Sequence, residues 1–183
     1  WYFEQLFVNG RRAVRARSPN RFYYYVADKV EYGADPATGE TVDLRNRAFV
    51  ARPGDMKPWA DLSDVTVVAY HSWEASRHRI ASFDALTNTV VLTGPAPWPF
   101  LAWGPSQRYH LENFREALDA PGEWFLSRDG TLYYKPVPGE DPREAEIIAP
   151  ATEEFVRLAG QPEQGQYVEH ISLRGLAFRH SQY

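Results

Sequence analysis

Turn-forming residues divide this chain so often that no long helix fits between them. Fourteen prolines and twelve glycines are spread over its 183 residues, and no segment longer than about six residues shows a clean helical period. Apolar and β-branched runs recur instead at intervals of roughly 8 to 12 residues, which is typical of short strands joined by tight turns. The sequence therefore predicts an all-β fold.

Three hairpins are the clearest local signals, because each has turn-forming residues between two runs of apolar or β-branched residues. Asn-Gly and Asp-Gly pairs tolerate the positive φ angles that a tight hairpin turn requires. The hairpins are predicted at 123–135 around Asp129-Gly130, at 6–17 around Asn9-Gly10, and at 77–92 around a turn at 84–88, next to the β-branched run 65–70.

Other stretches give weaker predictions. The aromatic run 22–27 is bounded by turn residues and predicts a buried strand. The stretch 109–119 has a short helical pattern in which Glu112 and Glu116 share one solvated face. Residues 94–105 contain four prolines, which predicts a long surface loop.

The last strand-like run changes its phase in the middle. Its apolar positions, Ile171 and Leu173 and then Leu176 and Phe178, shift by one residue across Gly175. A single flat strand would keep its phase, whereas a bend at a glycine would shift it. Two short strands that meet at a bend are typical of one coil of a parallel β-solenoid.

Charge and composition argue against several kinds of partner. The net charge is −4, and no basic run is long enough to follow a nucleic acid. Arg11, Arg15 and Arg17 share one strand face, which we expect to be solvated. No apolar run reaches the roughly 18 residues that span a bilayer, so no membrane partner is expected. There is no cysteine, which excludes disulfides and thiolate metal sites.

Tryptophans are the best candidates for ligand contact. Six tryptophans and an aromatic content of 15% favour carbohydrate, because sugar rings stack on aromatic faces. Trp73, Trp98 and Trp103 are the predicted carbohydrate-binding tryptophans, and the alternative is that Trp73 anchors the core while the other two pin their loop. Arg77 and His78 lie near Trp73 and are candidates for hydrogen bonds to sugar hydroxyls.

Several stretches together resemble one family. The resemblance is to bacterial right-handed parallel β-helix glycoside hydrolases of the family 141 type, it covers most of the chain, and its most specific part is the PGEW…GTLYY…P run. The stretches are EQLFVNGRRAVRARSP at 4–19, HSW at 71–73 leading to Arg79-Ile80, LENFREALDAPGEWF at 111–125 with GTLYYKPVPGEDP at 130–142, and VEHISLRGLAFRHS at 168–181.

The resemblance implies a small antiparallel β-sandwich or barrel-like inserted domain, flanked by strands of a right-handed parallel β-helix. Residues 1–20 would enter the β-helix, 21–166 would be the inserted β-domain, and 167–183 would resume a coil that is truncated. Both ends look cut, so we expect a segment of a longer protein. The remainder of the β-helix is then an expected partner, together with a polysaccharide or oligosaccharide.

The implied activity is hydrolysis of glycosidic bonds in plant-type polysaccharides, with fucosidase and xylanase members in the family, in a secreted or periplasmic protein. The catalytic acids are expected beyond Tyr183, so this segment would shape the substrate groove and no catalytic residue is assigned in it. Two alternatives stay open. One is a non-catalytic carbohydrate-binding or structural β-module, and the other is a polysaccharide lyase or epimerase on a β-helix scaffold.

Residue patterns alone assign no reaction centre. A glycosidase needs two carboxyl groups roughly 5 to 10 Å apart, and among 24 acidic residues some pair is always available by chance. The spacing of His71 and His78 matches no familiar ligand motif, so no metal and no cofactor is expected. The chain also has no G-x-S-x-G motif and no glycine-rich phosphate loop.

Overall fold

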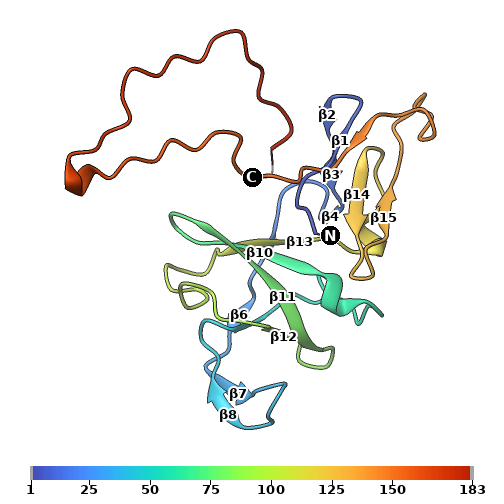
Figure 1. Ribbon diagram of the computed structural model, residues 1–183. Coiled ribbons are helices and arrows are strands. Elements are labelled where there is room, and N and C mark those ends of the chain that lie inside the picture. Colours follow the sequence, from blue (N-terminus) through green and yellow to red (C-terminus); the bar gives the residue numbers. More distant parts are fainter. Residues whose placement is uncertain (1, 182–183) are drawn as a thin grey trace. The chain divides into compact units, whose positions relative to one another are not determined.

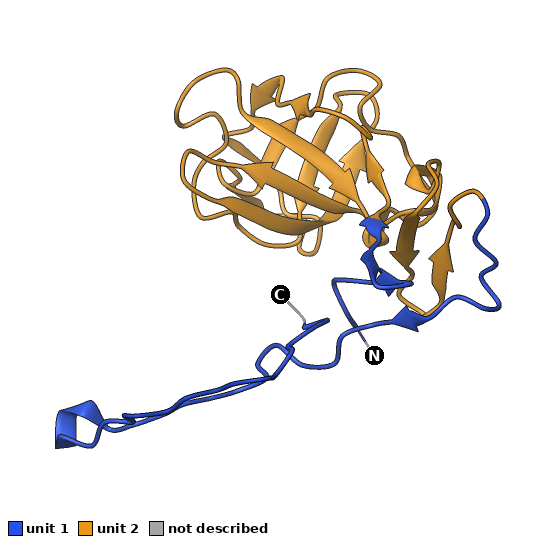
Figure 2. Cartoon of the chain, turned by 90° about the horizontal axis from the view of Figure 1, so that it is seen from above, with its two compact units in different colours: residues 1–14, 139–183 blue, residues 15–138 orange. Residues whose placement is uncertain are grey.

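The computed structural model describes residues 2–181. The chain divides into two compact units, a smaller one of Trp1–Val14 with Gly139–Tyr183 and a larger one of Arg15–Pro138 (Figure 2). Strands and irregular segments make up both, and the helical parts of the described residues are single 3-10 turns. The prediction of an all-β fold is confirmed. None of the helices in the described part has the length and apolar character that a membrane crossing requires.

The strands are short and follow one another closely along the chain (Figure 1). They are β1 (Phe7–Val8), β2 (Arg11–Arg12), β3 (Val14–Arg15), β4 (Arg17–Ser18), β5 (Tyr24–Tyr25), β6 (Asp28–Lys29), β7 (Tyr32–Ala34), β8 (Thr41–Asp43), β9 (Ala48–Val50), β10 (Thr66–Tyr70), β11 (Ala75–Asp84), β12 (Thr89–Leu92), β13 (Arg108–Glu112), β14 (Glu123–Leu126), β15 (Leu132–Tyr134) and β16 (Ile147–Ile148). The 3-10 turns are η1 (Leu62–Asp64), η2 (Arg115–Ala117) and η3 (Pro162–Gln164).

An antiparallel sheet of eight strands forms most of the larger unit. Its order is β4-β13-β10-β11-β12-β9-β6, with β5 also paired to β13. The ten-residue strand β11 pairs with β10 along its first half and with β12 along its second, as the predicted hairpin requires. The register shifts between Ile80 and Ser82, which is a β-bulge that bends the strand. Side chains from both halves of the sheet therefore enter one core.

The core of this unit is aromatic and β-branched. Val67, Leu111 and Tyr109 alternate inward along β10 and β13 and are fully buried. The ring of Phe49 packs 4.9 Å from that of Phe100 and 5.0 Å from that of Tyr109, centroid to centroid. A buried aromatic side chain of this size is worth several kcal/mol, about 3–5 when it is truncated to alanine. The core thus fixes the loops that follow β10 and precede β13.

A second sheet, of order β15-β14-β3, contains the predicted hairpin at 123–135. The ring of Phe125 stacks on that of Tyr133 across the strand pair, with 4.6 Å between centroids. The turn is longer than predicted, because the last pair is Leu126 with Leu132 and five residues lie between them. Within the turn Gly130 has a φ of +88°, whereas Asp129 does not take a positive φ. The Asp129 carboxylate accepts a hydrogen bond from the backbone N–H of Thr131.

Two sequence predictions in the larger unit are wrong in part. The run 22–27 contains the short strand β5 and the buried Val26, but it is not one continuous buried strand. Phe22 has a φ of +63° and is 84% exposed, because a turn at this point is held by the Arg17 guanidinium on the Phe22 carbonyl. The stretch 109–119 begins as strand β13, and its helical part is limited to the single 3-10 turn η2. Pairing with β10, β4 and β5 outweighs the local helical pattern there.

The predicted solvated arginine face is also wrong in part, because the strand is interrupted. It breaks into β2, β3 and β4, and Arg15 is buried while Arg11 is exposed. The guanidinium of Arg15 lies 5.1 Å from the ring centroid of Trp124 and donates through Nε to Asn113. These contacts keep the charge of Arg15 away from the solvent.

The smaller unit has a three-stranded sheet of order β16-β1-β2. Asn9 and Gly10 have φ angles of +50° and +72°, which confirms the predicted type I′ hairpin turn. The side chain of Asn9 connects this turn to the segment 140–146 by two hydrogen bonds. It donates to Glu140 Oε1 at 3.0 Å and accepts the backbone N–H of Glu146 at 2.9 Å.

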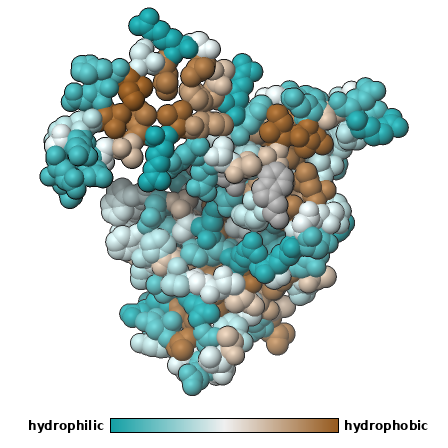
Figure 3. Space-filling view, viewed as in Figure 1, coloured by the Kyte–Doolittle hydropathy of each residue, from teal (hydrophilic) through white to brown (hydrophobic). Residues whose placement is uncertain are grey.

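Residues 151–181 form an arm with almost no internal pairing. The arm carries exposed apolar side chains, which gather as brown atoms at the upper left of Figure 3. They are Phe155, Val156, Leu158, Tyr167, Val168, Ile171, Leu173, Leu176 and Phe178. The ring of Phe155 lies 5.7 Å from that of Phe178, and His180 lies 4.5 Å from Phe7, so the arm returns to β1.

The predicted final strands are not formed within the described part of the arm. Gly175 has a φ of +68°, in agreement with the predicted bend, yet the residues on either side pair with no strand. A strand needs a neighbour for its backbone groups, and no such neighbour is present among residues 2–181. The flanking β-helix and the domain bounds 1–20, 21–166 and 167–183 therefore stay predictions. Gln182 and Tyr183 lie outside the described residues.

Candidate carbohydrate-binding site

The proline-rich loop 94–105 is fixed to the core at two points. Ala96 and Phe100 are buried, and their backbone N–H groups donate to the carbonyls of Asn46 and Arg45 at 2.6 and 2.8 Å. Leu101 takes an unusual left-handed conformation with a φ of +60°. Its N–H donates to Gln107 Oε1 at 2.6 Å, which holds the backbone there. The loop is irregular, as predicted, but it is a firm support for the side chains that it carries.

Three of the tryptophans meet on the surface at this loop. Trp103 lies between the other two, with ring centroids 5.6 Å from Trp73 and 5.1 Å from Trp98, and both contacts are edge-to-face. Their exposed fractions are 81% for Trp73, 43% for Trp98 and 47% for Trp103. We call these three residues the tryptophan cluster. The alternative that Trp73 anchors the core is wrong, since most of its surface faces the solvent.

A carboxylate orients one ring of the tryptophan cluster. The indole Nε1–H of Trp98 donates to Glu74 Oε1 at 2.6 Å. Glu74 also closes the turn after β10, because its carbonyl accepts the backbone N–H of His71 at 2.8 Å. The cluster thus joins the β10–β11 turn to the proline-rich loop, two segments that lie far apart in the sequence.

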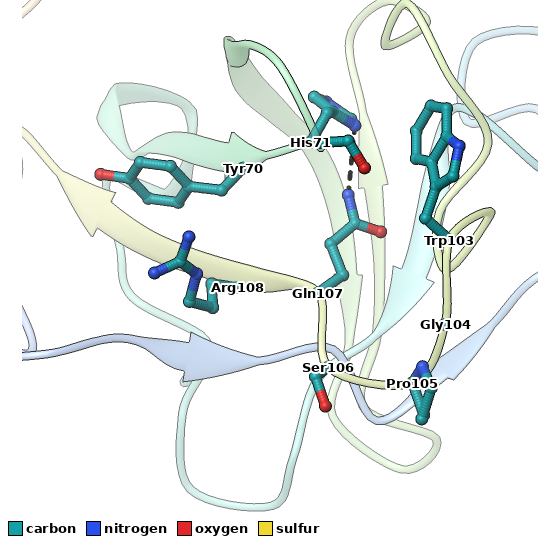
Figure 4. A pocket seen from close by; sticks show the side chains of 9 residues that line it. Tyr70, His71, Trp103, Gly104, Pro105, Ser106, Gln107 and Arg108 are labelled. Atoms are coloured by element: carbon teal, nitrogen blue, oxygen red, sulfur yellow. Dashed lines mark hydrogen bonds between the residues drawn. The ribbon is translucent and has the colours of Figure 1, made fainter.

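A pocket of about 280 Å³ lies beside Trp103 (Figure 4). Its volume is just below the roughly 300–1,000 Å³ typical of small-molecule sites, which leaves room for a small part of a longer ligand. The lining comes from the end of β10, the proline-rich loop and the start of β13. It consists of Tyr70, His71, Ser72, Trp103, Gly104, Pro105, Ser106, Gln107 and Arg108.

A chain of hydrogen bonds fixes one wall of the pocket. The amide Nε2 of Gln107 lies 3.2 Å from His71 Nδ1, and His71 Nε2 lies 2.8 Å from Ser76 Oγ. Since the amide nitrogen donates, Nδ1 is the acceptor and Nε2–H donates to Ser76. Burial lowers the pKa of His71. The imidazole is therefore neutral at pH 7 and acts as a positioning group.

Arg77 and His78, the other two predicted sugar contacts, point to opposite sides of β11. Arg77 lies on the face away from Ser76, and its Nη1 is 3.5 Å from Glu112 Oε2. His78 is half-buried on the same side as Ser76, and burial lowers its pKa. The structure thus brings the three predicted tryptophans together, and it places Arg77 in a different polar cluster. Sugar contact by any of these side chains stays a prediction.

Glu112, which the sequence placed on a solvated helix face, is buried in that second cluster. His110 Nε2 lies 2.8 Å from Glu112 Oε1, and His110 Nδ1 lies 3.3 Å from the Tyr70 hydroxyl. Burial acts to raise the pKa of Glu112, but the His110 hydrogen bond and the charge of Arg77 outweigh it and lower that pKa. The cluster stabilises a carboxylate rather than exposing an acid for catalysis.

Sequence reasoning missed Gln107 and Arg108, which line the pocket where β13 begins. The alternation of charged and apolar residues in RYHLE at 108–112 is the signal that could have identified a strand there. Within the described part of the chain, no group of three or more His, Cys, Asp or Glu side chains is arranged to hold a metal ion.

One solved structure, named "Glycoside hydrolase", is similar to this chain. The two share 27% sequence identity with a TM-score of 0.64, over 88% of this chain and 29% of the other. This chain therefore spans less than a third of that protein's length. No protein-family model matches the chain, and the comparison with curated proteins finds no similar one. The chain has a fold that is also found in a glycoside hydrolase.

Proposed function

We propose that this chain is a segment of a carbohydrate-active enzyme, a glycoside hydrolase of the family 141 type that acts on plant-type polysaccharide outside the cytoplasm. In this proposal the segment binds the glycan and shapes the substrate groove, and the catalytic acids belong to another part of a longer protein. The likeness to a glycoside hydrolase over 88% of the chain supports the proposal. The tryptophan cluster supplies the binding surface.

The observation that carries the proposal is the gathering of three exposed indoles, Trp98 and Trp103 from the anchored proline-rich loop and Trp73 from the β10–β11 turn. Large apolar side chains that lie together on a surface mark binding sites more often than isolated ones do. Tryptophan offers a flat apolar face for the C–H groups of a sugar ring and an N–H for a hydroxyl. Because the loop is anchored through Ala96 and Phe100, these faces are held in place before a ligand arrives.

The groups that line the pocket suit binding. They supply hydroxyls, an amide, an imidazole and a guanidinium around one tryptophan face, and these are the polar groups that orient a ligand. Glycosidic bond cleavage requires a pair of carboxyl groups instead. We therefore assign this segment a binding role, and a carbohydrate-binding β-module without a hydrolase partner is the second candidate.

The exposed arm supports a place within a longer protein. Its apolar side chains form a surface of the kind that proteins usually cover. In the proposal, 167–183 pairs with further β-helix strands supplied by the longer chain. The bend at Gly175 suits that role. A protein that acts on polysaccharide is expected to be secreted or periplasmic.

The proposal is tested by affinity electrophoresis of the chain in gels that contain xylan, galactan or polygalacturonate. Retardation in at least one polymer is expected, and Trp103→Ala should weaken it roughly tenfold, as loss of a central aromatic anchor does. The matched control is Tyr32→Ala, which removes an exposed aromatic ring from β7. Equal binding by the parent and Trp103→Ala would remove the tryptophan cluster from the account.

A further inference from the structure

We infer that the pocket beside the tryptophan cluster recognises a carboxylate on the sugar, so that the glycan is one that contains uronic acid. The inference rests on the proposed function, because it names the class of sugar that the same site takes. The observation behind it is Arg108, a pocket residue whose positive charge has no ion-pair partner among the described residues.

The guanidinium of Arg108 has an unusual set of contacts. It lies 4.9 Å from the ring centroid of Tyr23 and 5.5 Å from that of Tyr70, and Figure 4 shows it directed toward Tyr70. The two tyrosine rings themselves meet edge-to-face, with 4.9 Å between centroids. No hydrogen bond or ion pair of the guanidinium occurs among the described residues. The side chain is exposed, so its N–H donors are available to an acceptor on a ligand.

Two carboxylates that contact the neighbouring clusters are already engaged. Glu74 accepts the indole N–H of Trp98, and Glu112 is bound by His110 and Arg77. Neither is left to neutralise Arg108. An arginine held over aromatic rings is a pre-organised fork, which matches a carboxylate in two parallel hydrogen bonds. Because its rotamers are restricted before binding, less entropy is lost when an anion arrives.

The rest of the pocket suits the remainder of a sugar residue. Trp103 supplies an apolar face at the end away from Arg108 in Figure 4, with the pair of Gln107 and His71 between them. The hydroxyls of Ser72 and Ser106 also line the pocket and take no side-chain hydrogen bond within the described residues. A pocket of about 280 Å³ with a guanidinium, hydroxyls and an aromatic face fits one uronic acid unit of a longer chain.

The test compares two polymers that differ only at carbon 6, polygalacturonate and its carboxyl-reduced form, in affinity gels of the 183-residue chain. We expect the chain to bind polygalacturonate about five- to tenfold more tightly than the reduced polymer, which is a modest effect for an exposed charged hydrogen bond. Arg108→Gln should bind both polymers equally. Arg108→Lys should retain part of the preference, because it keeps the charge but loses the fork.

Controls separate this inference from general electrostatics and from the proposed function. Arg52→Gln removes another arginine that lies over a tyrosine, 5.3 Å from the ring centroid of Tyr25 but outside the pocket, and should leave the preference unchanged. Equal effects of Arg52→Gln and Arg108→Gln would overturn the inference. So would equal binding of the two polymers by the parent chain, or dextran sulfate bound as tightly as polygalacturonate. If no glycan binds at all, the proposed function fails with it.

Discussion

Asn113 offers a quantitative test of how the larger unit holds together. It is a buried residue just after β13, with a φ of +65° and a side chain that joins three segments. Its Oδ1 accepts the Leu126 N–H at 3.0 Å and Arg15 Nε at 3.2 Å. Its Nδ2 donates to the carbonyls of Leu126 at 3.0 Å and Asp64 at 3.2 Å. The substitution Asn113→Ala removes all four hydrogen bonds at once.

The expected loss follows from two physical effects. Each buried hydrogen bond contributes about 1 kcal/mol net, so the four contribute about 4 kcal/mol. Alanine in the left-handed region of φ adds a backbone cost of about 1 kcal/mol to this loss, because it has a Cβ and no polar side chain to offset it. Asn113→Ala should therefore lower the free energy of unfolding by about 5 kcal/mol. Asn113→Gly, which is free of the backbone effect, should lose about 1 kcal/mol less.

The assay is urea unfolding followed by tryptophan fluorescence, with Asn88→Ala as the matched control. Asn88 has a φ of +56°, and its side chain makes no hydrogen bond within the described residues, so its replacement reports the backbone effect alone. If Asn113→Ala lowers the free energy of unfolding no more than Asn88→Ala does, the four hydrogen bonds do not stabilise the fold as expected. If Asn113→Ala does not fold, the difference between Asn113→Gly and Asn88→Gly still measures the hydrogen bonds, because neither glycine variant has the backbone cost.

Two further predictions concern acid stability and the arm. Burial acts to raise the pKa of Glu112, but the larger combined effect of His110 and Arg77 lowers it. The ionised carboxylate therefore stabilises the fold above the unfolded pKa of about 4.3, and this stabilisation is lost as the pH falls through the folded pKa. Glu112→Gln should therefore destabilise the chain at pH 7 and flatten the decline of its unfolding free energy below about pH 5 in urea titrations, and an unchanged decline would contradict this. Limited proteolysis should cut first within 151–181, where nearly every residue is exposed, and a first cut within β10 to β13, identified by mass spectrometry, would contradict that expectation.

Features that depend on local chemistry were predictable from the sequence. Asn9-Gly10 formed the expected tight turn because positive φ is a property of those two residues. The β-branched run at 65–70 became a central strand, β10, for the same local reason. The proline-rich loop could not become a regular element, and the structure agrees.

Features that depend on distant partners were not predictable. The neighbours of strand β13 are one such feature, because β10, β4 and β5 pair with it from other parts of the chain. Phe22 looks buried by composition, yet a turn held by Arg17 turns it outward. The tryptophan cluster was predicted residue by residue, but its assembly depends on Ala96 and Phe100, which anchor the loop to a core that local patterns do not reveal.

Glycan binding by the tryptophan cluster can be observed at each ring through the indole N–H signals of the ¹⁵N-labelled chain. On titration with oligogalacturonides or with neutral xylo-oligosaccharides, the signals of Trp73, Trp98 and Trp103 should shift together with a single dissociation constant. The signal of Trp124, which is buried, should stay in place. Shifts at Trp124 without shifts in the cluster, or no shift with either series, would contradict the account.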